Sequence, residues 1–220
     1  MIVLAIDTTT ARESLAVVSD GALRGELRLF STDTHSRRLV PALEFLLAQL
    51  AMAPSAVEGF AVTTGPGSFT GLRVGLSTVQ GLALAAGRPC FAVSALDVLA
   101  ARIIGGAPRL AALMDAYRGE VFAGLYDETA RPLGAPLVTP LEPWLRTLPP
   151  GVAFIGDAVE ARRAVIEACC TAPVFPPRSL FLAGTLAMMA EPELRAGRGV
   201  AAEHLRPLYL REAAIRRPGP

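Results

Sequence analysis

Two short segments carry the residue types that could do chemistry. The first is Ile6-Asp7-Thr8-Thr9-Thr10, in which a carboxylate and three hydroxyls follow an apolar run. A turn of this kind can hold phosphate through backbone N–H groups and hydroxyls, while the carboxylate orients a hydrated Mg²⁺. A polar turn that closes a hairpin is the alternative, because Asp and Thr satisfy turn backbone groups well. No glycine follows Asp7, which disfavours close approach of phosphate, so we interpret Asp7, Thr8 and Thr9 as a vestigial phosphate turn.

The second segment is the run Gly65-Pro66-Gly67-Ser68-Phe69-Thr70-Gly71-Leu72-Arg73-Val74-Gly75. Free N–H groups at a helix start, with an arginine one turn further on, would suit an anion. A Gly-x-Ser-x-Gly nucleophile elbow does not fit, because Pro66 and Thr70 stand where glycine is required. A packing role fits best: Gly71 and Gly75 lie four positions apart, so another helix could approach this bare face closely. We predict that the helix binds a partner protein; packing of the bare face within its own lobe stays an alternative.

Metal and hydrolytic chemistry find little support. The two histidines, His35 and His204, are each followed four positions later by leucine, which leaves no pair of metal ligands at helical spacing. All 21 basic residues are arginine, so a P-loop lysine, a Schiff base and a Ser-Lys dyad are excluded. A Ser-His-Asp triad stays open from sequence alone, without a motif in its favour.

Composition limits the class of protein. The 220 residues are 52% hydrophobic with a mean hydropathy of +0.43, enough to build a core and too apolar for a disordered chain. Charged residues and prolines interrupt every apolar stretch before the ~18 residues of a membrane span. The start lacks the features of a signal peptide, and three cysteines do not suit a disulfide framework, so we expect a cytoplasmic protein. The net charge of +1 argues against strong independent binding of nucleic acid.

The first half of the chain alternates strand and helix patterns. Asp20-Gly21 is a strong hairpin signal between two of the strands, and Ser68 is a good N-cap for the helix after the glycine-rich turn. A glycine- and proline-containing linker at 105–108 follows. The predicted strands are 2–7, 14–19, 22–30, 57–64 and 89–93, and the predicted helices are 36–52, 68–86 and 94–104.

The second half begins by repeating the first. Residues 109–115 form an apolar strand ending in Asp115, as residues 2–7 end in Asp7. In both halves this strand is followed by a turn with Arg and Glu, by a second strand that ends in Asp, and by a third strand. We therefore predict two related lobes. Chance similarity of short strands stays open as the alternative. Further predicted elements are a strand at 152–155 and helices at 140–147, 157–170 and 179–190. The class is α/β, with an N-terminal lobe at 1–104 and a diverged C-terminal lobe at 109–220.

Four segments together resemble the bacterial TsaB (YeaZ) family. They are Ile6-Asp7-Thr8-Thr9, the GPGSFTGLRVG run with Gln80-Gly81-Leu82-Ala83, Asp115-Ala-Tyr-Arg118-Gly-Glu120-Val-Phe, and Pro207-Leu-Tyr-Leu-Arg211. The resemblance implies a two-lobed actin-like ATPase fold (ASKHA, ribonuclease H-like) built from duplicated β-β-β-α units. It also implies an accessory role in the synthesis of threonylcarbamoyladenosine in tRNA.

In that family the first two helices, here about 36–52 and 68–86, form the packing surface. The resemblance implies a homodimer in isolation, a heterodimer with a TsaD-like catalytic subunit, and a TsaE-like ATPase that joins the assembly. The complex uses ATP and transfers a threonylcarbamoyl group from its adenylate to N6 of adenosine 37 in tRNAs that read ANN codons. We predict an interface formed by these residues: His35, Arg38, Gly67, Ser68, Phe69, Thr70, Gly71, Arg73 and Gly75.

The catalytic relative carries a His-x-x-x-His metal motif. Here the stretch that begins at His35 has Leu39 at the second histidine position, so we expect a non-catalytic subunit that binds no metal or cofactor alone and meets tRNA only through the complex. Two alternatives stay open. One is an independent ATP-binding or ATP-hydrolysing protein that uses Asp7, Thr8, Thr9 and the turn at Asp115; the other, less favoured, is an M22-type glycoprotease.

Overall fold

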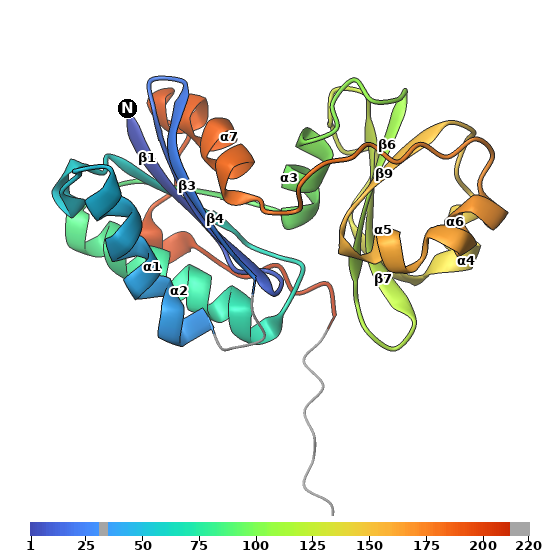
Figure 1. Cartoon of the computed structure of the whole chain (residues 1–220), viewed down its shortest axis with the longest axis horizontal. Helices are drawn as coiled ribbons and strands as arrows, with labels where there is room; N and C mark the ends of the chain where they lie inside the picture. Colours follow the sequence, from blue (N-terminus) through green and yellow to red (C-terminus); the bar gives the residue numbers. More distant parts are fainter. Residues whose placement is uncertain (31–34, 212–220) are drawn as a thin grey trace, which may run out of the picture.

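The computed structural model describes residues 1–30 and 35–211. It consists of two α/β lobes, each built on one β-sheet, with helix α3 (Ala95–Ala101) lying where the lobes meet (Figure 1). Within the described residues, no helix is both long and apolar enough to cross a membrane.

The first lobe contains a five-stranded sheet. Its order is β3-β2-β1-β4-β5, with β1, β2 and β3 antiparallel and β4 and β5 parallel to β1. The predicted hairpin turn is confirmed: Asp20 and Gly21 have φ of 51° and 73°, as the tight turns that match strand twist require. The strands are β1 (Ile2–Asp7), β2 (Arg12–Ser19), β3 (Ala22–Phe30), β4 (Gly59–Thr63) and β5 (Cys90–Val93).

Two helices cover one face of this sheet, α1 (His35–Gln49) and α2 (Phe69–Ala86). Their apolar stripes bury leucines and valines of both helices against the inner side chains of β1, β2 and β4. Ser68 caps α2 as predicted, because its Oγ accepts a hydrogen bond from Gly71 N at 3.2 Å. The helix ends at Gly87 in the left-handed conformation that glycine favours.

The second lobe repeats this arrangement. Its sheet has the order β8-β7-β6-β9, and β9 is parallel to β6 just as β4 is parallel to β1. The predicted duplication is therefore confirmed. The strands are β6 (Arg109–Asp115), β7 (Glu120–Asp127), β8 (Leu137–Pro140) and β9 (Val152–Ile155), and the helices are α4 (Leu141–Leu145), α5 (Asp157–Ala161) and α6 (Arg163–Cys169).

The structure departs from the predicted division at one place. Helix α7 (Ala183–Arg195) lies in the second half of the sequence but packs on β1 and β2 of the first lobe (Figure 1). The apolar face of the first sheet opposite α1 and α2 needs a cover, and α7 supplies it over fully buried Val3 and Ala16. After α7 the chain continues along the first lobe, where Leu208 N donates to Thr64 O at 2.7 Å.

Smaller differences concern helix lengths. The predicted helix at 157–170 is divided at Arg162 into α5 and α6, and the predicted helix at 179–190 begins and ends later. Two short 3₁₀ turns, Pro54–Ala56 and Ala202–His204, complete the described chain.

Candidate functional site

Asp7 ends β1 inside the first lobe. Its carboxylate is 1% exposed, and Oδ1 accepts hydrogen bonds from Thr63 Oγ1 at 2.6 Å and from Thr9 Oγ1 at 2.7 Å. Burial raises the pKa of Asp7, and these hydrogen bonds act in the opposite direction. Oδ2 has no hydrogen-bond partner among the described residues. The hydroxyl of Thr9 is therefore committed to Asp7, which leaves it unavailable to a phosphate.

The start of α2 closes the turn after β1. Thr8 Oγ1 donates to Gly71 O at 2.8 Å, and Ser68 N donates to Thr9 O at 2.7 Å. A Cβ atom at Gly71 would collide with Thr8 O, and one at Gly75 would collide with Thr8 Oγ1. The glycines are thus the positions at which the polar turn approaches the helix most closely.

This packing corrects the prediction for the bare face of α2. Gly71 and Gly75 are buried inside their own lobe, so the prediction that they receive a partner helix is wrong, and the alternative of packing within the lobe is right. The physical reason is that the stripe without side chains admits the turn that contains Thr8. Spacing along a helix shows that a close contact is possible but not which segment makes it.

The exposed residues of the same run form an aromatic stack. Phe69 is 39% exposed and its ring lies 5.2 Å from that of Tyr209, centroid to centroid. The guanidinium of Arg73 lies 3.9 Å from the centre of the Phe69 ring, and its Nε donates to Tyr209 Oη at 3.3 Å. Thr70 is exposed, whereas Gly67 and Ser68 are half-buried. Of the predicted interface residues on α2, Phe69, Thr70 and Arg73 are accessible.

Three of the sequence motifs meet around one cavity of about 410 Å³. The glycine-rich run contributes the start of α2, and the motif that begins at Asp115 contributes the turn between β6 and β7. The last motif contributes the segment Leu208–Arg211. In that turn Tyr117 and Arg118 adopt left-handed φ values of 59° and 55°, which cost energy for residues other than glycine. An ion pair between Arg211 and Glu120 joins the segment Leu208–Arg211 to the second lobe.

His35 and Arg38 lie at the start of α1. His35 is 8% exposed, and its Nδ1 lies 2.7 Å from Oε2 of Glu13, a carboxylate that is fully buried. Arg38 is half-buried. The sequence reasoning missed Glu13 as a partner; the available signal was a charged residue next to an apolar strand. His35 is consequently held inside the lobe and presents little surface to another protein.

A cleft of about 490 Å³ lies between the lobes, at the turn after β1 and the start of α2. From the second lobe Asp115 and Asp157 line it, and Asp115 N donates to Asp157 Oδ1 at 3.1 Å. Burial raises the pKa of Asp157. The sequence analysis did not single out Asp157 as a residue of the cleft, because it stands at the start of a predicted helix. Across the described residues, no three His, Cys, Asp or Glu side chains are grouped so as to hold a metal ion.

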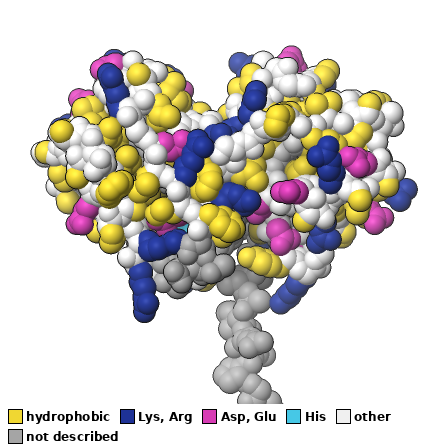
Figure 2. Space-filling model, viewed as in Figure 1, with side chains coloured by type: hydrophobic (Ala, Val, Ile, Leu, Met, Phe, Trp, Pro, Cys, Tyr) yellow, Lys and Arg dark blue, Asp and Glu magenta, His cyan; other side chains and the backbone are white. Residues whose placement is uncertain are grey.

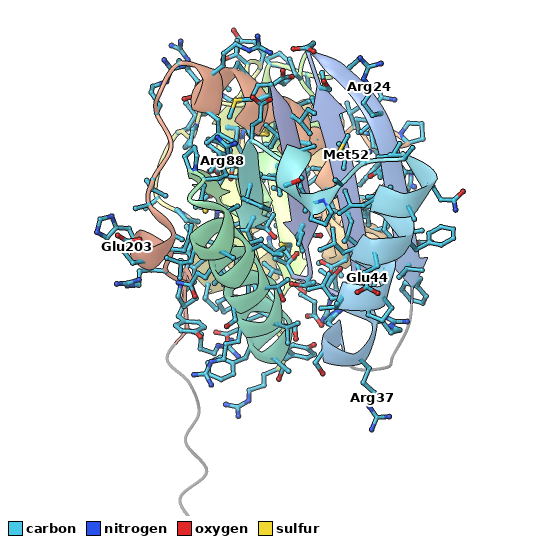
Figure 3. The ribbon with its side chains drawn as sticks, turned by 90° about the vertical axis from the view of Figure 1, so that its left-hand side faces the viewer. Arg24, Arg37, Glu44, Met52, Arg88 and Glu203 are labelled. Carbon is cyan, nitrogen blue, oxygen red and sulfur yellow. The ribbon has the colours of Figure 1, made fainter. Side chains whose placement is uncertain are left out.

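An apolar groove runs between α1 and α2 on the outer side of the first lobe. Figure 3 shows the two helices side by side, with Glu44 along α1 and Met52 in the segment that follows α1. The groove has a volume of about 600 Å³ and is lined mainly by aliphatic side chains of both helices and of the segment between α1 and β4. Val40 in its lining is 50% exposed, and Ala85 and Ala86 on its α2 side are also exposed. An accessible apolar face of this size is typical of a protein-binding surface.

Comparisons with known proteins agree with this architecture. Residues 30–214 match the family model for TsaD, tRNA N6-adenosine threonylcarbamoyltransferase. Two curated proteins named tRNA threonylcarbamoyladenosine biosynthesis protein TsaB are similar: that of Bacillus subtilis is 36% identical over 126 residues, and that of Escherichia coli 38% over 128. Each alignment covers 57% of this chain and 55% of the relative, so the match spans about half of the relatives' length.

Solved structures extend the similarity to almost all of the chain. YeaZ from Pseudomonas aeruginosa is 35% identical to this chain and superposes with a TM-score of 0.81. The match covers 95% of this chain and 99% of the YeaZ chain. A second solved structure, the activator of 2-hydroxyisocaproyl-CoA dehydratase from Clostridium difficile, shares the fold alone, with 11% identity and a TM-score of 0.54. The superposition covers 90% of this chain and 97% of the activator. These similarities confirm the predicted two-lobed actin-like fold. The chain belongs to the TsaB (YeaZ) family, within the wider group that the TsaD family model describes.

Proposed function

We propose that this protein is a non-catalytic accessory subunit in the synthesis of N6-threonylcarbamoyladenosine at position 37 of tRNAs that read ANN codons. In this proposal it activates a TsaD-like catalytic subunit, a TsaE-like ATPase joins the complex, and the complex uses ATP. The protein forms a homodimer in isolation, works in the cytoplasm and binds no cofactor alone. Family membership supports the pathway, because the curated relatives are named for it.

The observation that carries the accessory role is the apolar groove between α1 and α2. It combines two long helices, a volume of about 600 Å³ and a wall that includes half-exposed Val40 and the exposed residues Ala85 and Ala86. Burying such aliphatic side chains against a complementary face stabilises a complex by about 25 cal/mol per Å² of apolar area before the costs of association. The occupant that we propose is the corresponding helical face of the TsaD-like subunit, which the family model relates to this chain.

The absence of independent catalysis is supported by the closed turn after β1. Thr8 and Thr9 are fully engaged with Gly71 and Asp7, so a nucleotide phosphate would have to displace the start of α2. On the side of the second lobe, the interlobe cleft is lined by the carboxylates of Asp115 and Asp157, which repel a phosphate placed between them and the turn after β1.

The test is pairing with the TsaD-like subunit from the same organism, followed by size-exclusion chromatography with light scattering. Val40→Glu and Ala85→Glu place carboxylates on the wall of the groove and should abolish the heterodimer. The matched control Leu133→Glu alters a side chain that is 49% exposed in the second lobe and should leave pairing unchanged. If both groove variants pair like the wild type, the proposed docking surface is wrong. The protein alone should yield no modified tRNA, whereas the assembled complex should.

The cleft motivates a second candidate, an independent ATP hydrolase that uses Asp7 and the turn at Asp115. Steady ATP turnover by the purified protein, lost in Asp7→Ala, would favour this candidate over the accessory role. A peptidase activity has less support, because Ser68 Oγ is occupied as the cap of α2. Lack of covalent labelling of Ser68 by a serine-directed probe would dismiss it.

A further inference from the structure

A strip of arginine and phenylalanine side chains lies at the junction of the two lobes, outside the groove and the closed turn. Figure 2 shows dark blue side chains gathered along this junction, with hydrophobic side chains between them. We call the strip the junction surface. It consists of Arg12, Arg28, Phe30, Arg102, Arg178 and Phe181.

Strand register places the first three residues on one face. Arg12 of β2 lies directly opposite Phe30 of β3, and Arg28 is two residues before Phe30, so all three side chains point to the same side of the sheet. The guanidinium of Arg12 lies 5.4 Å from the centre of the Phe30 ring. Phe30 is 67% exposed, so nothing within the described chain covers most of this ring.

The other residues come from segments distant in sequence. Arg178 Nε donates to the carbonyl oxygen of Arg102 at 3.2 Å, which places Arg178 at the end of α3. The guanidinium of Arg28 lies 5.7 Å from the centre of the Phe181 ring. Burial lowers the pKa of Arg102, the carboxylate of Glu26 acts in the opposite direction, and the nearby positive charges of Arg28 and Arg178 act in the same direction as burial. The fold therefore brings like charges together at this surface.

These positive charges outnumber the carboxylates near them, which are Glu26 beside Arg28 and Arg102 and, across the cleft between the lobes, Asp157 near Arg12. Among the ion pairs of the described residues, Arg28 pairs with Glu26 at 2.6 Å, and Arg12, Arg102 and Arg178 form none. Arg102 Nε is buried without an acceptor in the part of the chain that the structure describes. The whole protein carries a net charge of only +1, so the positive potential is local to the junction surface. Its complement is a ligand with closely spaced negative charges.

We propose that the junction surface binds an unpaired stretch of RNA, with phosphates on the arginines and a base stacked on Phe30. Guanidinium groups match phosphate oxygens in geometry, and exposed aromatic rings beside arginines are what unpaired bases stack on. An acidic protein would account for the arginines but not for the alternation of guanidinium groups with aromatic rings. The inference rests on the proposed function, in which tRNA is the substrate, and it adds a direct contact where the sequence led us to expect contact through the complex only.

The experiment measures the fluorescence anisotropy of a labelled, unmodified tRNA transcript titrated with the protein. Wild type should bind with a Kd of about 1–100 µM at physiological salt, and log K should fall linearly with log salt between about 50 and 200 mM. The double variant Arg28→Gln, Arg178→Gln should reduce the magnitude of that slope by about 1.4, since each phosphate contact on a single strand contributes about 0.7. Phe30→Ala should weaken binding at least about five-fold.

Matched controls separate local recognition from general charge. Arg24 and Arg88 are exposed on the face shown in Figure 3, away from the junction surface, and Arg24→Gln, Arg88→Gln should leave the slope unchanged. Phe45, 55% exposed on α1, is the aromatic control for Phe30. Equal effects of the two arginine pairs, no effect of Phe30→Ala, or no binding of tRNA by the wild type would each overturn the proposal.

The same variants are then tested for pairing with the TsaD-like subunit. If they pair normally but lose tRNA, the junction surface is supported independently of the groove. If the wild type binds tRNA in the predicted way but does not pair, the accessory role fails while the RNA contact stands. If tRNA binding is unaffected but the junction variants lose the partner, the surface binds protein and the RNA assignment is wrong.

Discussion

The hydroxyl of Thr8 donates a 2.8 Å hydrogen bond to the carbonyl oxygen of Gly71, which ties the turn after β1 to the first turn of α2. This contact joins two segments that the sequence presents as separate candidate sites. It also explains the glycine spacing on α2, because Gly75 faces the same threonine one turn later. The two motifs therefore form one packed structural unit inside the first lobe.

Gly75→Ala should destabilise the protein itself. The added methyl group would meet Thr8 Oγ1 in a buried, closely packed position, and over-packing of this kind costs about 1–3 kcal/mol. Gly81 lies on the same helix, and a methyl group added there would meet no atom within 4 Å, so Gly81→Ala should stabilise by up to about 1 kcal/mol. Urea unfolding of both variants measures the difference. Equal stability of the two variants would contradict the packing role of Gly75.

Asp7→Asn should change how stability depends on pH. Burial raises the pKa of Asp7 above its ordinary value of 3.8, so the folded state binds the proton more tightly than the unfolded state does. This carboxyl therefore favours folding fully below the unfolded pKa and loses that contribution as pH rises through the folded pKa. The free energy of unfolding of Asp7→Asn, relative to wild type, should rise with pH over this window.

Asp20 supplies the control of opposite sign. The N-terminal amine and Arg195 hold the pKa of Asp20 well below 3.8, so its contribution is present above that value and is lost as pH falls. Asp20→Asn should therefore reduce the stability difference between neutral and acid pH. Chemical denaturation over a pH series measures both variants, and the same trend in both would contradict these assignments.

His35→Ala should destabilise the first lobe. The substitution removes the group that lies 2.7 Å from the buried carboxyl group of Glu13, and a buried polar group left without its hydrogen-bond partner costs about 1–3 kcal/mol. Adding Glu13→Gln should recover part of the loss, because an amide is less costly to bury than a carboxylate. Thermal unfolding of the single and double variants measures this, and a loss below about 0.5 kcal/mol in His35→Ala would refute the contact's importance.

Phe69 and Tyr209 should show measurable coupling. Their rings stack at 5.2 Å between centroids, and aromatic pairs contribute about 0.5–1.5 kcal/mol beyond the area that they bury. A double-mutant cycle with Phe69→Ala and Tyr209→Ala, read by urea unfolding, isolates this energy. The cycle of Phe69→Ala with Phe45→Ala, on a different helix, should give no coupling. Equal coupling in the two cycles would show that the measured energy does not arise from the stack.

The sequence by itself determined most of the elements and the family. The hairpin at Asp20-Gly21, the Ser68 cap and the repeated strand pattern are all present in the structure. Each depends on residues a few positions apart, where backbone conformation and side-chain periodicity decide the local structure. The motifs at Asp7, Gly65 and Asp115 also sufficed to identify the relatives.

Only the tertiary structure decided what those residues contact. Gly75 could have faced another protein, and it faces Thr8 because β1 and α2 meet inside one lobe. In the same way α7 packs on the first sheet, and Glu13 becomes the partner of His35. These contacts join positions far apart in the chain. Which distant segments meet depends on how the whole apolar surface is buried at once, and no local pattern of residues encodes that outcome.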